Sequence, residues 1–213
     1  HDIRFSSIGI DNGLSHATVN GICQDALGYI WIATPDGLDR YDGNRFETFI
    51  TDSIDHNIKA VTSDPAGNIW AITARVLSCY SPISESFTNY SFPDKASLTT
   101  VFPINQEHIA VGTSAGLYIF DKSKRKFLLA GNTGNDHLTA ISSFNGNLVF
   151  GTYDGRVRQL DGRRIIDLAN AGSEINALLP DKGALLVATE GDGLSCYNPV
   201  SYTHLTLPTK RIV

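Results

Sequence analysis

One segment of this chain returns along its whole length: Trp31-Ile32-Ala33-Thr34-Pro35-Asp36-Gly37-Leu38-Asp39-Arg40-Tyr41-Asp42. Its apolar start, its glycine and its second apolar stretch predict a strand, a tight turn and another strand, because glycine permits the positive φ of such turns. The threonine that ends the first strand recurs as Thr34, Thr73, Thr113, Thr152 and Thr189, in steps of 39, 40, 39 and 37 residues. A nearly fixed period of this length predicts a repeat protein.

Further positions keep the same period. Gly37 is matched by Gly116, Gly155 and Gly193, and Tyr41 is matched by Tyr80, Phe120, Leu160 and Tyr197. Leu38 follows the glycine directly, and Trp70 repeats Trp31. The second copy has Val76 in place of the glycine, and the fourth has Arg156 directly after it. These departures lie in or beside the turn, where loops tolerate change.

Each repeat contains short apolar segments separated by turns rich in Gly and Asp. Four strands in about 39 residues are typical of a β-propeller blade. A helical solenoid is excluded, because no long segment has a 3.6-residue period. The sequence therefore predicts an all-β propeller with five visible four-stranded blades, the last one incomplete, at residues 17–50, 58–92, 98–131, 138–168 and 174–199.

The two ends of the chain are expected to differ from these blades. Residues 1–16 should hold a strand at Ile3 to Phe5 and a lead-in loop from a preceding blade, so that the partial propeller spans 1–199. Residues 200–213 share nothing with the other fourth strands. Because Val200 to Leu205 resemble the translated end of a sequencing adapter, this tail is expected to be non-native.

Two outcomes are open for a five-bladed chain. An open propeller would expose apolar strand surface, so the isolated chain would be marginally stable or prone to aggregation. Alternatively, Ile3 to Phe5 would complete the fifth blade and close a five-bladed ring.

The composition excludes several classes of partner. The chain has 213 residues and a net charge of −5. Its only basic cluster, residues 122–126, falls in a predicted turn, so nucleic acid is not an expected partner. No apolar run approaches the roughly 20 residues of a membrane-spanning helix. Because the chain begins with His1 and contains no methionine, it is expected to be processed or partial.

The residues that usually carry catalysis form no recognisable motif. The six histidines are scattered, and the sequence contains no Gly-x-Ser-x-Gly, His-Glu-x-x-His or Cys-x-x-Cys. Cys79 and Cys196 occupy equivalent positions in separate repeats, which lie too far apart for a disulfide. Cys23 lies within a predicted strand, and all three cysteines are expected to be reduced and packed. The sequence predicts no catalytic residue, no metal site and no cofactor.

Two features that look functional are better explained as scaffold. The Asp-x-x-Gly-x-Ile-Trp segments at Asp25 and Asp64 resemble the Asp-box of propeller sialidases, which is a structural hairpin turn. Trp31 and Trp70 lie inside predicted second strands rather than loops. We therefore expect their rings to pack between adjacent blades instead of stacking on sugars.

A resemblance to a known family rests on a set of residues centred on the first repeat: Gly13-Leu14-Ser15, Val19, Ile22, Asp25, Gly28-Tyr29-Ile30-Trp31-Ile32-Ala33-Thr34, Gly37-Leu38, Arg40-Tyr41-Asp42-Gly43 and Phe46. They resemble the two-component regulator propeller repeat. The likeness extends, more loosely, from Asp11 to about Pro199.

This resemblance implies a function. Such repeats form the extracytoplasmic sensor region of hybrid two-component histidine kinases in Bacteroidetes-type bacteria, usually as seven-bladed propellers. The chain would then be a fragment of the periplasmic part of an inner-membrane protein. Its ligand would be an oligosaccharide, its partners the neighbouring blades and domains of the same polypeptide, and the full-length protein a possible homodimer. Contact with the membrane would be made only through segments absent from this chain.

Ligand contacts are expected at one face of the propeller, where the turns between second and third strands and the connections between blades emerge. The predicted contacts from these turns are Asp36, Arg75, Tyr153, Asp154, Glu190 and Asp192; Ser114 lies in the same position. The connections carry His16, Asn57, Asp136, His137 and Glu174. Carboxylates and tyrosine suit sugar hydroxyls, and Arg75 would suit a uronate or a sulfate.

Two alternatives to a ligand-binding sensor remain open. The first is a propeller used only for contacts with other proteins. The second is a propeller glycosidase or lyase, which would need two carboxylates within about 5–10 Å of each other. Asp36, Asp154, Glu190 and Asp192 are the candidates for such a pair.

Overall fold

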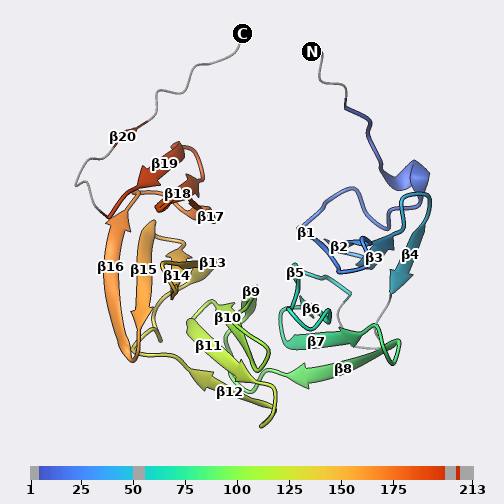
Figure 1. The fold of residues 1–213 in the computed structure, drawn as a ribbon, viewed down its shortest axis with the longest axis horizontal. Coiled ribbons are helices and arrows are strands. Elements are labelled where there is room, and N and C mark those ends of the chain that lie inside the picture. The colour runs from blue at the N-terminus through green and yellow to red at the C-terminus, as the bar shows by residue number, and fades with distance from the viewer. Residues whose placement is uncertain (1–4, 50–55, 200–204, 207–213) are drawn as a thin grey trace. The chain divides into compact units, whose positions relative to one another are not determined.

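The computed structural model describes residues 5–49, 56–199 and 205–206. Its strands form five four-stranded antiparallel sheets, each with its strands in sequence order, as in the blades of a β-propeller (Figure 1). A short 3-10 turn, η1 (Ile10–Asn12), precedes the first sheet. The predicted all-β propeller is therefore confirmed. The chain divides into two compact units, 1–92 and 93–213, and each is described by itself.

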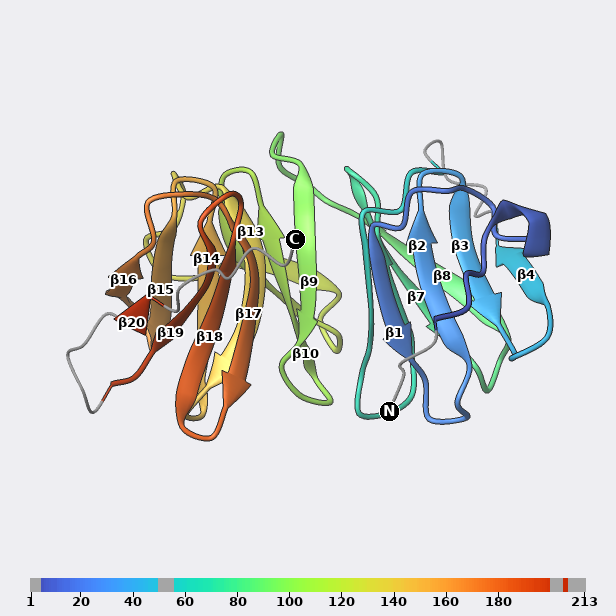
Figure 2. The ribbon, with the colours of Figure 1, turned by 90° about the horizontal axis from the view of Figure 1, so that it is seen from above.

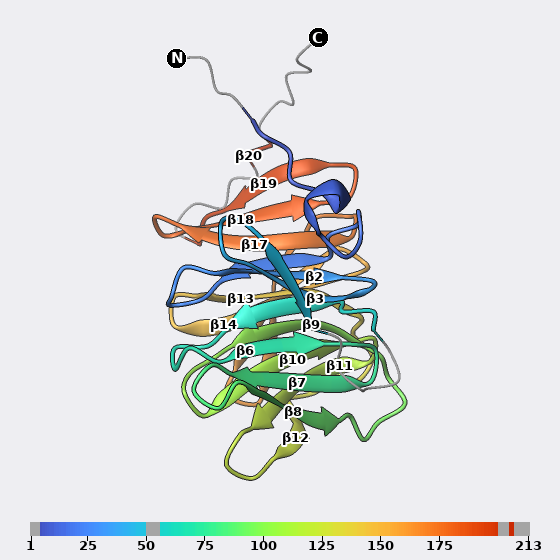
Figure 3. The same ribbon diagram turned by 90° about the vertical axis from the view of Figure 1, so that its right-hand side faces the viewer.

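The first unit contains two blades. Their strands are β1 (Gly21–Gln24), β2 (Ile30–Thr34), β3 (Gly37–Tyr41) and β4 (Phe46–Phe49), then β5 (Ala60–Ser63), β6 (Ile69–Ile72), β7 (Val76–Ser81) and β8 (Ser86–Ser91). The antiparallel pair β6 and β7 can be followed in Figure 3.

The second unit contains three blades. The third blade of the chain has β9 (Leu98–Pro103), β10 (His108–Thr113), β11 (Gly116–Asp121) and β12 (Lys126–Leu129). The fourth has β13 (Leu138–Phe144), β14 (Asn147–Thr152), β15 (Arg156–Asp161) and β16 (Arg164–Asn170). The fifth has β17 (Ile175–Asp181), β18 (Ala184–Thr189), β19 (Gly193–Tyr197) and β20 (Leu205–Thr206).

The strands lie where the repeat pattern placed them. The fifth blade has a fourth strand, but it is short: in β20, Leu205 pairs with Cys196 and Thr206 pairs with Ser195. Most of the predicted tail and most of the predicted strand at Ile3 to Phe5 lie outside the described residues. The predictions of a non-native tail and of a closed ring therefore stay predictions.

The turn between the first and second strands of each of the first two blades is built around an aspartate. Oδ1 of Asp25 accepts the backbone N–H of Leu27 at 2.9 Å and that of Tyr29 at 3.0 Å. Its other oxygen, Oδ2, accepts the indole N–H of Trp31 at 2.8 Å. Gly28 closes the turn with a φ of 91°, which a side chain would strain. Asp64 makes the matching bonds to Ala66, Asn68 and Trp70 in the second blade, so the structural interpretation of both turns is confirmed.

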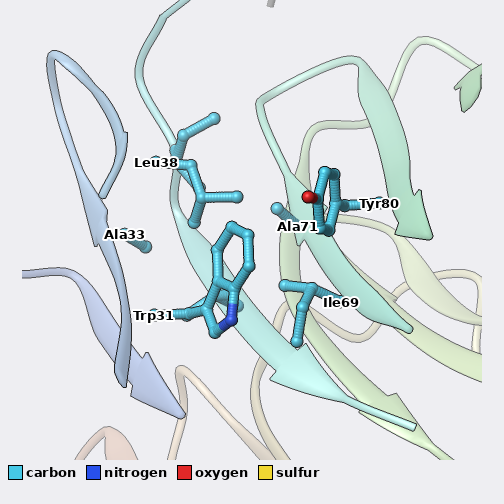
Figure 4. Packing of buried hydrophobic residues seen from close by; sticks show 8 residues of the cluster. Trp31, Ala33, Leu38, Ile69, Ala71 and Tyr80 are labelled. Carbon is cyan, nitrogen blue, oxygen red and sulfur yellow. The ribbon is translucent and has the colours of Figure 1, made fainter. Parts of the chain in front are cut away.

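Trp31 fills the seam between the two blades of the first unit. Its side chain is fully buried, and its ring centroid lies 5.3 Å from that of Phe49 in its own blade and 5.1 Å from that of Tyr80 in the next. Figure 4 shows the indole among apolar side chains from both blades, including Ile69. The predicted packing role of Trp31 is confirmed. Trp70 is also buried and stacks on Tyr90 within its own blade; its packing between blades stays a prediction.

In the second unit, the first strands of consecutive blades pack together. Figure 2 shows β13 beside β17, and the hydroxyl of Thr139 donates a 2.6 Å hydrogen bond to the carbonyl of Ile175. Apolar clusters fill the seams on either side of the fourth blade, around Phe150 and around Val187. The Thr139 hydrogen bond holds the beginning of the fifth blade beside the beginning of the fourth.

The recurring threonine has a structural cause. The hydroxyl of Thr113 donates to the carbonyl of Gly116 at 2.8 Å and accepts the N–H of Ala115 at 3.1 Å. The hydroxyls of Thr34 and Thr189 make the same bond to the carbonyls of Gly37 and Gly193, each at 3.1 Å. A buried threonine therefore satisfies the polar groups of each turn that it precedes, as buried backbone groups require.

The loop before the first strand is fastened to the third strand in three blades. Ser15 donates from its N–H and its hydroxyl to Oδ2 of the buried Asp39, at 2.9 and 2.6 Å. In the third blade, the hydroxyl of Tyr118 donates to Asp94 at 2.8 Å. In the fourth, Arg158 donates to Asp136 at 2.6 Å. The Gly13-Leu14-Ser15 motif thus belongs to the scaffold. Within the described residues, no helix is long or apolar enough to cross a membrane.

Candidate functional site

The turns and connections predicted to bind ligand do meet at one end of each blade in the second unit. The first residue of each turn donates its N–H to the carbonyl of the residue that leads into the first strand: Ser114 to Ser97 at 2.8 Å, Tyr153 to His137 at 2.9 Å, and Glu190 to Glu174 at 2.9 Å. Two segments far apart in sequence are therefore held side by side in every blade of this unit.

In the first unit, the connection between blades lies beside the turn of the first blade. The N–H of Ile58 donates to the carbonyl of Thr34 at 2.9 Å, and the side chain of Asn20 donates to the carbonyl of Ile58 at 2.8 Å. Asp36 is exposed at this turn. Arg75 is exposed at the turn of the second blade, where its guanidinium donates to the carbonyl of Phe92 at 3.3 Å.

Other predicted positions serve local structure. The Nδ1 atom of His16 accepts the N–H of Thr18 at 2.9 Å, which shapes the loop before the first strand. The side chain of Asn20 lies 3.5 Å from Oδ1 of Asn57. These contacts hold the connection but do not by themselves indicate a ligand.

The fourth blade carries an exposed aromatic pair on this end. The rings of His137 and Tyr153 are nearly parallel, with an interplanar angle of 14° and a centroid separation of 5.4 Å. Tyr153 is 59% exposed, and His137 is exposed as well. The sequence placed both residues in this region, but it did not show that they stack.

Beside this pair lies a network of charges that the sequence did not reveal. The carboxylate of Asp136, whose side chain is only 4% exposed, accepts from Arg158 at 2.6 Å and from Arg156 at 3.3 Å. Arg156 also pairs with Asp154 at 2.8 Å, and Arg158 pairs with Asp167 at 2.6 Å. The alternation of Arg156 and Arg158 along β15 was the available signal, since alternate residues of a strand share a face.

This network perturbs the titration of its exposed members. Hydrogen bonds from Arg156 and then from the Thr152 hydroxyl hold the pKa of Asp154 below its usual range. The hydrogen bond to Asp154 in turn raises the pKa of Arg156. Asp154 therefore remains ionised and is suited to accept hydrogen bonds rather than to donate a proton.

The predicted residues of the fifth blade have partners in that blade or in the connection that leads into it. The carboxylate of Glu190 accepts from the amide of Asn176 at 2.9 Å, and that of Asp192 accepts from the hydroxyl of Ser173 at 2.6 Å. Asp154 is engaged with Arg156 in the fourth blade. The predicted carboxylates of this unit are thus each held by a different partner, and these contacts do not assemble an acid–base pair.

A cavity of about 510 Å³ lies between β16 and β19. It is lined mainly by apolar side chains, including Val157, Ala169 and Tyr197. In the first blade the register partners at this position are Leu38 and Phe49, whereas in the fourth they are Val157 and Ala169. The pair in the fourth blade is smaller, so it fills less of the seam beside it. None of the six predicted ligand residues lines the cavity.

The cysteines and the possible metal ligands can be examined in the part of the chain that the structure describes. The side chains of Cys23, Cys79 and Cys196 are partly buried. No group of three or more His, Cys, Asp or Glu side chains among these residues is arranged to hold a metal ion.

Comparison with known proteins agrees with the repeat pattern. A family model described as "Two component regulator propeller" matches residues 13–36. No curated protein matches the chain in sequence. Three crystal structures illustrate the likeness in fold.

The first is the extracellular domain of a B. thetaiotaomicron protein assigned as a hybrid two component system. It is 20% identical with a TM-score of 0.61, over 92% of this chain and 35% of that one. A second such domain from the same organism is 16% identical with a TM-score of 0.73, over 85% of this chain and 27% of that one. The chain therefore spans well under two thirds of the length of either domain.

The third is virginiamycin B lyase from Staphylococcus aureus, which is 11% identical with a TM-score of 0.68, over 83% of this chain and 68% of that one. At these identities the similarity shows the β-propeller fold alone, and a sensor domain and an enzyme share it, so fold does not decide function.

Proposed function

We propose that this chain is part of the extracytoplasmic sensor propeller of a hybrid two-component regulator, and that it binds an oligosaccharide. The match of residues 13–36 to the regulator propeller model supports the family. The extracellular two-component domains from B. thetaiotaomicron support both the architecture and a location outside the cytoplasm. In this proposal the kinase lies in parts of the protein beyond this chain.

The observation that carries the ligand-binding role is the end of the second unit where turns and connections meet. Hydrogen bonds between them hold Tyr153 against His137 and Glu190 against Glu174. Exposed rings and carboxylates are thus presented on a rigid scaffold, as sites that recognise polar ligands require. A ligand bound there would shift the equilibrium between two states of the receptor. The size of the shift is set by the difference between the ligand's affinities for the two states.

An enzymatic role is less well supported by the same geometry. Glycoside hydrolysis needs one carboxyl group poised as an acid close to a second carboxylate. Asp154 instead pairs with Arg156, which lowers its pKa, while Asp192 and Glu190 bind Ser173 and Asn176. We therefore propose that this part of the protein binds without catalysing a reaction.

Calorimetric titration of the chain with a panel of neutral and acidic oligosaccharides tests the proposal. We expect saturable binding of at least one of them and no change in the sugar, as followed by release of reducing ends. Cleavage of a bound sugar would replace the proposal with the glycosidase or lyase alternative. Absence of binding across the panel would favour a propeller that contacts only proteins.

A further inference from the structure

The fourth blade differs from the others at the turn between its second and third strands, where ligand contacts are expected. The other turns place Pro35-Asp36, Ala74-Arg75, Ser114-Ala115 and Glu190-Gly191-Asp192 at this position. Only the fourth places an aromatic side chain there, and the structure shows that Tyr153 is 59% exposed. One exposed apolar side chain is common on a protein surface and needs no explanation. Here, however, a second exposed ring, that of His137, stacks on Tyr153, and this pairing calls for an explanation.

The two rings are fixed before any ligand arrives. The N–H of Tyr153 donates to the carbonyl of His137 at 2.9 Å. The hydroxyl of Thr152 accepts the N–H of Arg156 at 2.9 Å, which closes the turn. Gly155 is packed so tightly that a Cβ there would lie 2.8 Å from the backbone of Ser173. A preordered platform loses little conformational freedom on binding, which favours affinity.

The charges around the rings discriminate between ligands. Three carboxylates, those of Asp136, Asp154 and Asp167, face the two guanidinium groups of Arg156 and Arg158. Both guanidinium groups are already engaged, and one negative charge remains in excess. A phosphate, sulfate or uronate would therefore meet net repulsion. Asp154, whose side chain is 57% exposed, keeps lone pairs that can accept hydrogen bonds from hydroxyl groups.

We propose that His137 and Tyr153 form a stacking platform for a neutral pyranose ring, whose hydroxyl groups donate to Asp154. The C–H face of a pyranose is apolar and matches an exposed aromatic ring in size. This inference rests on the proposed function and deepens it by naming one subsite and its ligand class. It also assigns neutral rather than acidic sugars to the fourth blade.

The test uses the full chain and neutral gluco-, manno- and galacto-oligosaccharides, with an oligogalacturonate as the acidic comparison. Tyr153→Ala and His137→Ala should each weaken binding of the best neutral sugar by about tenfold, the scale of an aromatic contact. Tyr153→Phe should retain binding within about twofold, because it keeps the ring. Phe5→Ala serves as the control, because Phe5 is a ring that is 93% exposed elsewhere on the chain.

The outcomes separate this inference from the proposed function. If the unaltered chain binds a neutral sugar and the double variant Tyr153→Ala/His137→Ala binds it equally well, the platform is wrong but the proposed function stands. If the unaltered chain binds no sugar, the proposed function fails and the platform fails with it. Tighter binding of oligogalacturonate than of every neutral sugar would overturn the assignment of ligand class. Equal unfolding midpoints would show that the variants keep the fold.

Discussion

The indole N–H of Trp31 donates a 2.8 Å hydrogen bond to Oδ2 of Asp25, and Trp70 and Asp64 repeat this bond at 2.8 Å. The aspartate that shapes the turn therefore also fixes the ring of the second strand. Because Trp31 is fully buried, its N–H has no access to water and depends on this acceptor. In each of these blades, one carboxylate therefore both closes the turn and holds the buried indole ring in place.

Asp25→Ala should be strongly destabilising. It removes the acceptor of three hydrogen bonds, from Leu27, Tyr29 and Trp31, and leaves a buried N–H unpaired. We expect the free energy of unfolding to fall by at least about 2 kcal/mol. Urea denaturation measures it, with Asp181→Ala at an exposed strand end as the control. Equal stability of the two variants would show that the turn does not depend on Asp25.

Trp31→Ala should cost about 3–5 kcal/mol, as expected for removal of a large buried ring. The ring bridges two blades through Phe49 and Tyr80, so its loss opens a cavity in the seam. Trp31→Phe should cost less, since it keeps part of the aromatic packing. Chemical denaturation followed by circular dichroism measures both variants. An unchanged midpoint for Trp31→Ala would contradict the role of the seam.

Thr113→Val tests the hydroxyl that closes each turn. Valine preserves the shape of the side chain but loses the bonds to the carbonyl of Gly116 and the N–H of Ala115. Because Thr113 is fully buried, we expect a loss of about 1–3 kcal/mol. Thr113→Ser keeps the hydroxyl and should recover part of that loss. Valine more stable than serine would indicate that packing outweighs the hydrogen bonds.

Asp136→Ala should destabilise the fourth blade more than Arg156→Ala. Asp136 is 4% exposed and pairs with two arginines, whereas Arg156 is 34% exposed. Removing Asp136 leaves Arg158 with only the exposed Asp167 as an ion-pair partner, and the loss of a buried partner can cost up to about 3–5 kcal/mol. Thermal unfolding of both variants would show which one is less stable. A less stable Arg156→Ala variant would show that water solvates Arg158 once Asp136 is removed.

Cys23 should make stability depend on alkaline pH. Burial, aided by the charge of Asp25, raises the pKa of its thiol from 9.0 to about 12. Because the folded value lies above the unfolded one, this stability is fully present below pH 9.0 and is lost as the pH rises toward about 12. The free energy of unfolding should therefore fall less steeply over this range in Cys23→Ala. Parallel profiles would show that the thiol ionises freely in the folded chain.

Much of the scaffold could be predicted from sequence because its determinants are local and repeated. Thr34 and its four equivalents set the period, and Asp25 with Gly28 specified the first turn. The same pattern showed where Tyr153 and Asp154 would lie, at the end of a second strand. It did not assign a structural role to the threonine, because its hydroxyl bonds become visible only once the turn has closed.

The sequence by itself determined the all-β class, the blade period, the turn aspartates and the burial of Trp31, since each follows from residues close together in the chain. Only the tertiary structure decided that His137 stacks on Tyr153 and that Asp136 takes both Arg156 and Arg158. These groups come from a connection and from a turn and strand about 16 to 22 residues further on. No local pattern encodes their mutual distance, which is set by the antiparallel packing of the strands between them.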